Sequence, residues 1–266
     1  MGTGTAILIA TGVVAGVGLL IGLMLGVANK ALAVETDERV DAIRAALPGN
    51  NCGGCGYAGC DALAQAIVDG KAKTNACPVG GKESADAIAD IMGDAPMDVE
   101  RKTAFVRCAG TCEAAERAYD YYGATDCRLA AVVPGHGGKA CTHGCFGMGT
   151  CVRACKFDAI RIENGVAHVN REKCRACGMC IEACPQHLID WAPYTPPYQV
   201  ACHSTDKGKQ VRQVCQNGCI GCGLCARVCG VGAITVTDHL ASIDQSICIG
   251  CGECAKKCPA GIITAM

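Results

Sequence analysis

Cysteines are the residues of this chain best suited to chemistry, and those nearest the C-terminus are the most regularly spaced. The pattern C-x2-C-x2-C-x3-C occurs there twice, at Cys219, Cys222, Cys225 and Cys229 and at Cys248, Cys251, Cys254 and Cys258. Three thiolates on one tight loop can bind a cubane iron–sulfur cluster, and the fourth is placed to bind a second cluster nearby. The spacing therefore predicts a pair of metal clusters.

The crossed arrangement of two-cluster ferredoxins gives the ligands of each 4Fe–4S cluster. One cluster would be held by Cys219, Cys222, Cys225 and Cys258, and the other by Cys248, Cys251, Cys254 and Cys229. Structural zinc is the alternative, because zinc also binds C-x2-C pairs. Zinc sites use two separated pairs, whereas here three evenly spaced cysteines are followed by a fourth, so the clusters are favoured.

A different cysteine motif lies nearer the N-terminus. Its members, spaced C-x2-C-x4-C-x16-C, are Cys52, Cys55, Cys60 and Cys77. The glycines between Cys52 and Cys60 let the backbone turn sharply and offer amide donors to cluster sulfurs. A phosphate-binding loop is the weaker interpretation, since no strand precedes the glycines and no Lys-Ser/Thr pair follows them. We expect a further 4Fe–4S cluster here.

The C-terminal half contains an internal repeat of 74 residues. The cysteines with a counterpart 74 residues later are Cys145, Cys151, Cys155, Cys174, Cys177, Cys180 and Cys184. Four isoleucines each follow the last cysteine of a motif by five residues: Ile160, Ile189, Ile234 and Ile263. An Asn164-Gly165 pair between alternating apolar residues predicts a β-hairpin. The repeat predicts two tandem ferredoxin-like domains, each a small α+β unit.

The first copy of the repeat departs from the pattern at Met148, which occupies the position of Cys222. Cubane clusters are held by thiolates, so a thioether is a poor substitute. We expect Cys141, four residues before Cys145, to replace the missing ligand. The clusters of this copy would then be held by Cys141, Cys145, Cys151 and Cys184, and by Cys174, Cys177, Cys180 and Cys155.

Five cysteines remain, namely Cys108, Cys112, Cys127, Cys202 and Cys215. Free buried thiols are ordinary in proteins, but five are many in a chain of cluster ligands. A sixth cluster could use Cys108, Cys112 and Cys127, with Cys202 or Cys215 as a distant fourth ligand. Alternatively, Cys141 serves that site and leaves the cluster beside Met148 with three thiolates.

The composition agrees with a protein built on metal centres. There are 25 cysteines, and aromatic residues make up 4% of the chain, so clusters are expected to supply folding energy that a small core cannot. The formal net charge of −1 gives no sign of nucleic-acid binding, and we expect none. The six histidines give little information: His143, between Cys141 and Cys145, could bind a metal, but we do not expect it to be a ligand. Catalytic triads, nucleotide fingerprints and flavin motifs are absent, so we expect no catalytic residues and no cofactor beyond the clusters.

An uncharged, apolar stretch covers residues 5–28 and is long enough to span a bilayer as a helix. A signal peptide would have positive residues before a shorter apolar core, and none precede this one. A buried core helix is the other alternative, but the unbroken length disfavours it. We predict a single-pass anchor in the cytoplasmic membrane, with the oxidant-sensitive clusters on the cytoplasmic side.

The predicted fold class is α+β, with an N-terminal transmembrane helix, a small helical 4Fe–4S domain and two tandem two-cluster bacterial ferredoxin-like domains. The expected boundaries are 1–34 for the anchor, 35–92 for the 4Fe–4S domain, 93–140 for a cysteine-bearing helical connector, 141–192 for the first ferredoxin-like domain, 193–215 for a linker and 216–266 for the second ferredoxin-like domain.

Taken in this order, the anchor, the Cys52–Cys77 site and the tandem ferredoxin motifs resemble the B subunit of the Rnf complex over the whole chain. The resemblance implies a subunit of an ion-translocating ferredoxin:NAD⁺ oxidoreductase that takes electrons from reduced ferredoxin and passes them to membrane subunits. Other subunits would carry flavins, reduce NAD⁺ and move Na⁺ or H⁺. Shorter family members carry one ferredoxin pair, so the second pair here is a departure.

Two other interpretations compete with this resemblance. One is a polyferredoxin subunit of another membrane redox enzyme, and the other is a zinc- or disulfide-stabilised interaction protein. On the favoured interpretation, soluble ferredoxin docks on the tandem half, and electrons run towards the Cys52–Cys77 cluster near the membrane. Basic residues close to the ligand loops would attract an acidic ferredoxin. They are Arg171, Lys173, Arg175, Lys207, Lys209, Arg212, Lys256 and Lys257.

Overall fold

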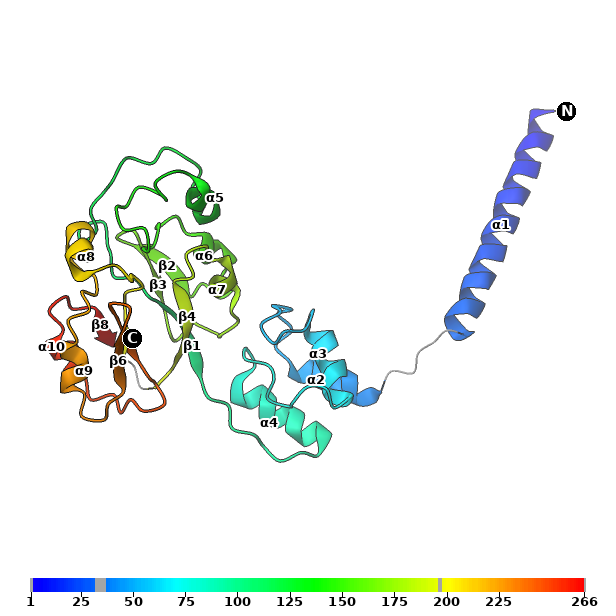
Figure 1. Ribbon diagram of the computed structural model, residues 1–266. Helices are drawn as coiled ribbons and strands as arrows, with labels where there is room; N and C mark the ends of the chain where they lie inside the picture. Colours follow the sequence, from blue (N-terminus) through cyan, green and yellow to red (C-terminus); the bar gives the residue numbers. More distant parts are fainter. Residues whose placement is uncertain (1, 32–36, 196–197, 266) are drawn as a thin grey trace.

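Three cysteine-rich modules follow an N-terminal helix in the computed structural model, which describes residues 2–31, 37–195 and 198–265 (Figure 1). Helix α1 spans Thr3–Ala31, and its segment Thr11–Ala28 has a mean hydropathy of 2.2 with none of its residues buried. By length and composition this helix could cross a membrane. The predicted boundary between residues 34 and 35, positions 196–197 of the linker and the two terminal residues lie outside the described residues.

The N-terminal module packs three helices, α2 (Glu38–Ala46), α3 (Cys60–Val68) and α4 (Gly81–Met92), around one small core. Asp37 starts α2 by accepting a hydrogen bond from the Arg39 amide, and Gly93 ends α4 in the left-handed conformation. Ile43, Leu63 and Ile88 are fully buried between the helices. The same core includes Cys60 and Cys77, so two predicted ligands are part of the packing itself.

The remaining chain forms two similar units, which we call unit 1 (residues 102–193) and unit 2 (residues 198–265). In unit 1 the elements are β1 (Lys102–Val106), α5 (Cys127–Val132), α6 (Thr150–Ala154), β2 (Ile160–Glu163), β3 (Val166–Val169), α7 (Met179–Ala183) and β4 (Ile189–Pro193). In unit 2 they are β5 (Tyr198–Val200), α8 (Gly208–Val214), α9 (Leu224–Val228), β6 (Ile234–Thr237), β7 (Leu240–Ile243), α10 (Glu253–Lys257) and β8 (Ile263–Ala265).

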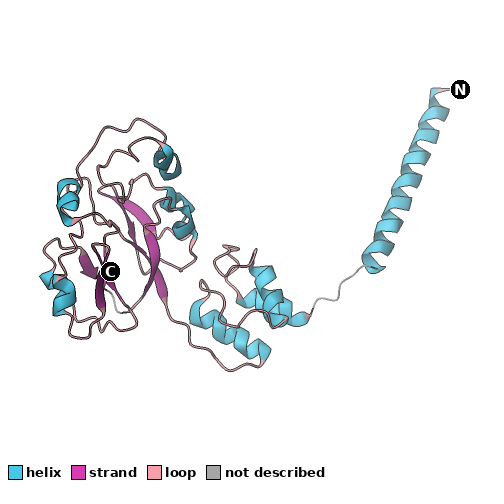
Figure 2. Cartoon of the chain, in the orientation of Figure 1, coloured by secondary structure: helices cyan, strands magenta, loops and turns pink. Residues whose placement is uncertain are grey.

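Each unit contains two antiparallel strand pairs, and Figure 2 shows the strands gathered in this half of the molecule. In unit 1, β1 pairs with β4 and β2 with β3; in unit 2, β5 pairs with β8 and β6 with β7. Strand β1 comes from the predicted connector and β5 from the predicted linker. The first strand of each unit therefore pairs with its last strand, so that the two ends of the unit lie side by side.

The hairpin prediction is confirmed. Asn164 and Gly165 join β2 to β3 with φ values of 49° and 77°, which is the backbone that a tight two-residue turn requires. The four repeated isoleucines Ile160, Ile189, Ile234 and Ile263 begin β2, β4, β6 and β8 and are all buried. Their shared distance from a cysteine thus places each strand directly behind a ligand loop.

The connector prediction is wrong on one point. Residues 93–140, all of them described, contain the short helix α5 and strand β1, and most of the rest is loop. Its backbone groups bond to other segments instead of forming a helix: the Glu116 amide donates to the Val214 carbonyl at 2.9 Å, and the Ala118 amide to the Gly138 carbonyl at 2.9 Å. Most of the segment belongs to unit 1 and also contacts unit 2, so hydrogen bonds to residues distant in the sequence replace helical ones.

Candidate metal centres

Four short helices set the geometry of the ferredoxin-type motifs. Each of α6, α7, α9 and α10 follows a glycine with positive φ: 74° at Gly149, 81° at Gly178, 68° at Gly223 and 76° at Gly252. Glycine adopts this conformation at no steric cost. The third cysteine of the motif is then the second residue of the helix and is buried, while the fourth cysteine caps its C-terminus. The x3 spacing between the third and fourth cysteines is therefore about one helical turn, and the positive-φ glycine lies just before that helix.

Two predicted ligand sets each surround a single pocket. One pocket, of about 360 Å³, is lined by Cys219, Cys222, Cys225 and Cys258. The other, of about 310 Å³, is lined by Cys155, Cys174, Cys177 and Cys180. Both groupings follow the crossed pattern, with the fourth cysteine coming from the other motif of the unit.

Two further predicted sets also have their members close together. Cys248 and Cys251 lie near enough to Cys254 to act on its pKa, and Cys229 packs in the same core as Cys254. In the N-terminal module, Cys55 and Cys60 act in the same way on Cys77. Cys52 lies beside them on the loop that Asn51 closes, since the Asn51 side chain accepts a 2.8 Å hydrogen bond from the Cys60 amide.

The structure places a different cysteine beside Met148 from the one expected. A pocket of about 380 Å³ is lined by Cys127, Cys145, Cys151 and Cys184, so Cys127 rather than Cys141 lies with this set. Cys127 is the first residue of α5, and its amide donates a 2.8 Å hydrogen bond to the Thr150 side chain at the start of α6. Cys127 is therefore fixed at the end of the helix that carries Cys151.

One arginine holds this substitution in place. Arg153 on α6 donates to the Met148 carbonyl at 3.1 Å and to the Asp126 carboxylate, also at 3.1 Å. Asp126 in turn caps α5 by accepting from the Arg128 amide, and this contact is the main cause that lowers the pKa of its carboxyl group. Arg153 thus links Met148, which replaces the cysteine, to Asp126, which directly precedes Cys127.

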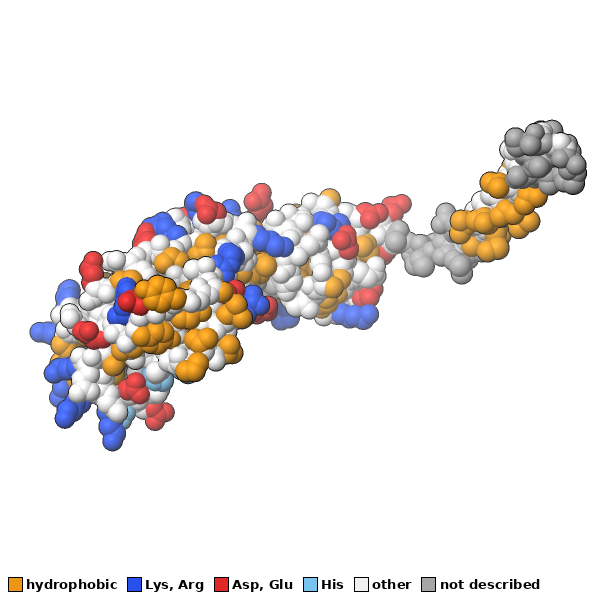
Figure 3. Space-filling model, turned by 90° about the horizontal axis from the view of Figure 1, so that it is seen from above, with side chains coloured by type: hydrophobic (Ala, Val, Ile, Leu, Met, Phe, Trp, Pro, Cys, Tyr) orange, Lys and Arg blue, Asp and Glu red, His pale blue; other side chains and the backbone are white. Residues whose placement is uncertain are grey.

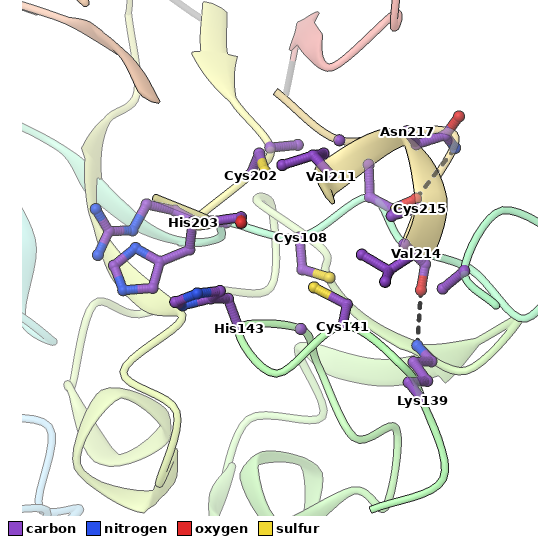
Figure 4. Close-up of a pocket in the computed structure, with 18 residues that line it drawn as sticks. Cys108, Lys139, Cys141, His143, Cys202, His203, Val211, Val214, Cys215 and Asn217 are labelled. Atoms are coloured by element: carbon purple, nitrogen blue, oxygen red, sulfur yellow. Dashed lines mark hydrogen bonds between the residues drawn. The ribbon is translucent and has the colours of Figure 1, made fainter. Parts of the chain in front are cut away.

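Cys141 lines a different pocket, shown in Figure 4, together with Cys108, Cys202 and Cys215. The pocket measures about 420 Å³ and lies between units 1 and 2. Figure 4 shows the sulfurs of Cys108 and Cys141 pointing toward one another. His143 lines the same pocket and lies 3.5 Å from the Asp206 carboxylate. Cys112, expected with Cys108 and Cys127, is exposed and lines neither this pocket nor the pocket of Cys127.

Burial and the proximity of other thiols both raise the pKa of cysteines in these pockets. Burial raises the pKa of Cys141 to about 11, and the three other thiols of its pocket contribute to the rise. Burial likewise raises the pKa of Cys151 and of Cys180 to about 12, with neighbouring thiols adding to it. Metal binding at these sites must therefore release protons, because the thiolate is the ligand.

The chemistry of the donor sets fits iron–sulfur clusters better than single ions. Among the residues that the structure describes, no three His, Cys, Asp or Glu side chains lie close enough to share one metal ion. A cubane binds each thiolate at a different iron, which suits four cysteines spread around a pocket. Backbone amides also donate to ligand sulfurs, for example from Ala159 to Cys155 at 3.4 Å and from Ala233 to Cys229 at 3.3 Å.

The structure groups two of the candidate cysteines differently from the sequence, for different reasons. Cys215 lies 74 residues after Cys141, so the internal repeat extends to this pair and could have grouped them. Cys127 has no counterpart at that distance, and no spacing rule points to it. Only the contact between α5 and α6 identifies its place.

These cysteine groups on ferredoxin-type motifs define an iron–sulfur protein that carries electrons through 4Fe–4S domains. The family model described as "4Fe-4S dicluster domain" matches residues 173–233 and 218–262, and the model described as "Putative Fe-S cluster" matches residues 47–79. The two models cover the Cys52–Cys77 motif, the second motif of unit 1 and both motifs of unit 2, whereas the motif at Cys145–Cys155 lies outside both matches.

Curated relatives extend the match to most of the chain. The B subunit of the Na⁺-translocating ferredoxin:NAD⁺ oxidoreductase complex of Acetobacterium woodii is 48% identical over 90% of this chain and 72% of its own length. The B subunit of the ion-translocating oxidoreductase complex of Methanosarcina acetivorans is 43% identical over 88% of each chain. The proton-translocating counterpart from Clostridium ljungdahlii is 41% identical over 86% of this chain and 81% of its own length.

The chain belongs to the family of the B subunits of ion-translocating oxidoreductase, or Rnf, complexes. This confirms the resemblance found in the sequence and decides against a polyferredoxin of another redox enzyme. The protein is thus an iron–sulfur electron-transfer subunit of a multi-subunit, membrane-associated complex.

Proposed function

We propose that this chain accepts electrons from reduced ferredoxin and passes them through its clusters to the membrane subunits of an Rnf complex. The complex would couple this transfer to NAD⁺ reduction and to Na⁺ or H⁺ translocation, as the names of the relatives state for their own complexes. Helix α1 would anchor the chain, with all clusters on the cytoplasmic side. The observation that carries the proposal is a row of cysteine groups that runs through both units to the N-terminal module.

Contacts between neighbouring groups support this row. In unit 2, α9 packs on α10, which brings the Cys219 and Cys248 motifs together. In unit 1, Cys151 lies near enough to Cys180 to contribute to its raised pKa, whose main cause is burial. Cys52 likewise lies near enough to Cys177 to contribute to its raised pKa, whose main cause is burial. A Cβ on Gly54 would lie 2.5 Å from the Cys177 carbonyl oxygen, so the loops of these two sites touch.

The exposure of the ligands gives the row a direction. Cys222 and Cys251 are exposed, so both sites of unit 2 reach the surface. The proposed ligands in unit 1 are buried or half-buried. Figure 3 shows Lys and Arg side chains gathered at the end of the molecule farthest from α1. Ferredoxin would dock on unit 2, and the N-terminal module, which follows the anchor in sequence, would deliver electrons to membrane partners.

The residues of the chain tune the sites that they hold. A bound 4Fe–4S cluster supplies reversible one-electron storage. Amide donors to thiolate sulfur stabilise the more negative, reduced charge state. The amide of Ala104 donates to Cys174 at 3.4 Å, that of Leu188 to Cys184 at 3.5 Å and that of Gly80 to Cys77 at 3.4 Å.

The test uses the full chain, prepared without oxygen. Iron and acid-labile sulfide should correspond to at least five 4Fe–4S clusters, and mixing with reduced ferredoxin should bleach the visible absorption of the protein. Protein stripped of iron by a chelator is the control and should show no bleaching. Iron for only two or three clusters, or a fully loaded protein that reduced ferredoxin leaves oxidised, would contradict the proposal.

A further inference from the structure

We propose that the pocket between units 1 and 2 holds a sixth 4Fe–4S cluster, bound by Cys108, Cys141, Cys202 and Cys215. The ligand set stands on the geometry of the pocket, and its use as a relay rests on the function proposed above. It replaces the set with Cys112 and Cys127 that the sequence suggests. With five other groups of four, this set accounts for all cysteines of the chain except Cys112.

The four thiols come as two equivalent pairs. Cys108 and Cys202 each lie two residues beyond the first strand of their unit. Cys141 and Cys215 each lie four residues before the first motif cysteine of their unit. Each unit thus contributes an equivalent pair of cysteines to the common pocket, and the two pairs come from opposite sides (Figure 4). A cluster there would join the units through its iron–sulfur bonds.

The walls of the pocket leave space beside the thiols. A Cβ on Gly110 would lie 3.3 Å from the Cys215 sulfur and 3.6 Å from the Cys108 sulfur, so any side chain there would intrude between two ligands. Val211, which is 1% exposed, and Val214 form an apolar wall from α8. Three other pockets of the protein are likewise lined by four cysteines.

Hydrogen bonds between the units fix the pocket. The Gln216 amide donates to the Ala114 carbonyl at 2.7 Å, and the Asn217 side chain donates to the Ala109 carbonyl at 3.1 Å. Lys139 donates to the Gly110 carbonyl at 2.6 Å and brings a positive charge to the rim. A nearby cation favours the more negative, reduced state of a cluster. The ligands are therefore held on both sides before any metal binds.

The pocket adjoins one site in each unit. The Cys145 amide donates to the Cys108 sulfur at 3.4 Å, and the Cys219 amide donates to the Cys202 sulfur at 3.3 Å. One electron from the reduced cluster at Cys219 would convert the bridging cluster from the 2+ to the 1+ state. Passing that electron on to the cluster at Cys145 would restore the 2+ state. No bond is made or broken, and no proton moves.

The experiment compares Cys202→Ala and Cys215→Ala with Cys112→Ala in the anaerobic full chain. Each pocket variant should lose the iron and sulfide of one cluster, while Cys112→Ala should keep the wild-type content. Ferredoxin should still reduce the clusters of unit 2 in the pocket variants. Reduction of the clusters in unit 1 and in the N-terminal module, followed by electron paramagnetic resonance of rapidly frozen samples, should be lost.

Iron and sulfide contents that both pocket variants share with wild type would overturn the ligand proposal. If the variants fail to fold, the wild-type content decides, because five clusters rather than six would also overturn it. These measurements need no electron donor, so they separate this proposal from the ferredoxin function. If the variants lack one cluster but the clusters of unit 1 are reduced as in wild type, the pocket binds a cluster that does not relay electrons between the units.

Discussion

Units 1 and 2 share one order of elements, but the site built on the first cysteine motif of each unit gains its four cysteines in different ways. In unit 2 all four cysteines come from the repeated motifs, including the exposed Cys222. In unit 1 the same position is Met148, and the buried Cys127 arrives from α5. The chain between Cys108 and Cys141 is much longer than the corresponding stretch between Cys202 and Cys215. That additional chain carries α5.

This contrast shows how a repeated module can be adapted to an inner position. A ligand from the motif loop leaves the site open at the surface, whereas a ligand from a separate helix covers it. Cys127 is 9% exposed and lines the same pocket as Cys151 and Cys184. On the function proposed above, unit 2 would exchange electrons with a soluble partner and unit 1 would transfer them within the chain.

Removing the ligand of α5 should have the largest effect on this comparison. We expect Cys127→Ala to lose the iron and sulfide of one cluster, because Met148 offers no thiolate at that position. Electron transfer from unit 2 to the N-terminal module should stop at the gap. Cys112→Ala, which changes an exposed cysteine of the same segment, should keep both the iron content and the transfer.

A second substitution makes this test sharper. Met148→Cys combined with Cys127→Ala restores the motif of unit 2 inside unit 1, so the double variant should regain the lost cluster. Measured iron and sulfide per chain would show the recovery. If Cys127→Ala alone retains wild-type iron, the assignment of Cys127 as a ligand is wrong.

The junction between unit 1 and the N-terminal module should show the next largest effect. In Gly54→Ala the new methyl carbon would meet the Cys177 carbonyl oxygen at 2.5 Å, so the loops must separate. Because the rate of electron transfer falls steeply with the distance between the two clusters, we expect a several-fold slower reduction of the cluster at Cys52. Iron content should not change. Rapid freezing and electron paramagnetic resonance would follow that cluster separately.

Gly230→Ala is the matched control for this junction. Gly230 also adjoins a cluster cysteine, but a Cβ there meets no atom within 4 Å, and its φ needs no glycine. This variant should transfer electrons at the wild-type rate. Equal rates in both variants would mean that the contact between Gly54 and Cys177 is not on the electron path.

Charge reversal on unit 2 should have the smallest effect. Lys207, Lys209 and Arg212 are exposed on and beside α8, whereas on α10 Lys256 is paired with Glu253 at 2.7 Å. Changing the first set to Glu should slow reduction by ferredoxin about tenfold at low ionic strength, and less in high salt. Changing Lys256 and Lys257 should do less, because two charges are reversed instead of three.

Reversal of Lys71 and Lys73 in the N-terminal module is the control for docking on unit 2. These lysines are exposed but lie far along the chain from the sites that reach the surface in unit 2. Stopped-flow bleaching at several salt concentrations would compare the three variants. Loss of reduction in the Lys71 and Lys73 variant alone would place ferredoxin on the N-terminal module instead.

The kind of metal centre and most of the local structure can be read from the amino-acid sequence alone. The positive-φ glycines before each motif helix, the Asn164-Gly165 turn and the buried isoleucines after each motif are properties of short stretches of chain. Such features depend on backbone freedom and on alternation of apolar residues, and both are visible along a sequence. The same holds for cysteines that are ligands within one repeated motif.

The places of the cysteines outside the motifs, in contrast, depend on how the chain folds in three dimensions. Cys127 reaches its site through the hydrogen bond to Thr150, and Cys108 reaches Cys202 because the two units pack together. Spacing along the chain says nothing about such neighbours, since the connecting segments are loops held by hydrogen bonds to distant backbone. Cys141 and Cys215 lie between these cases: the repeat relates them in sequence, but their shared pocket exists only where two folded units meet.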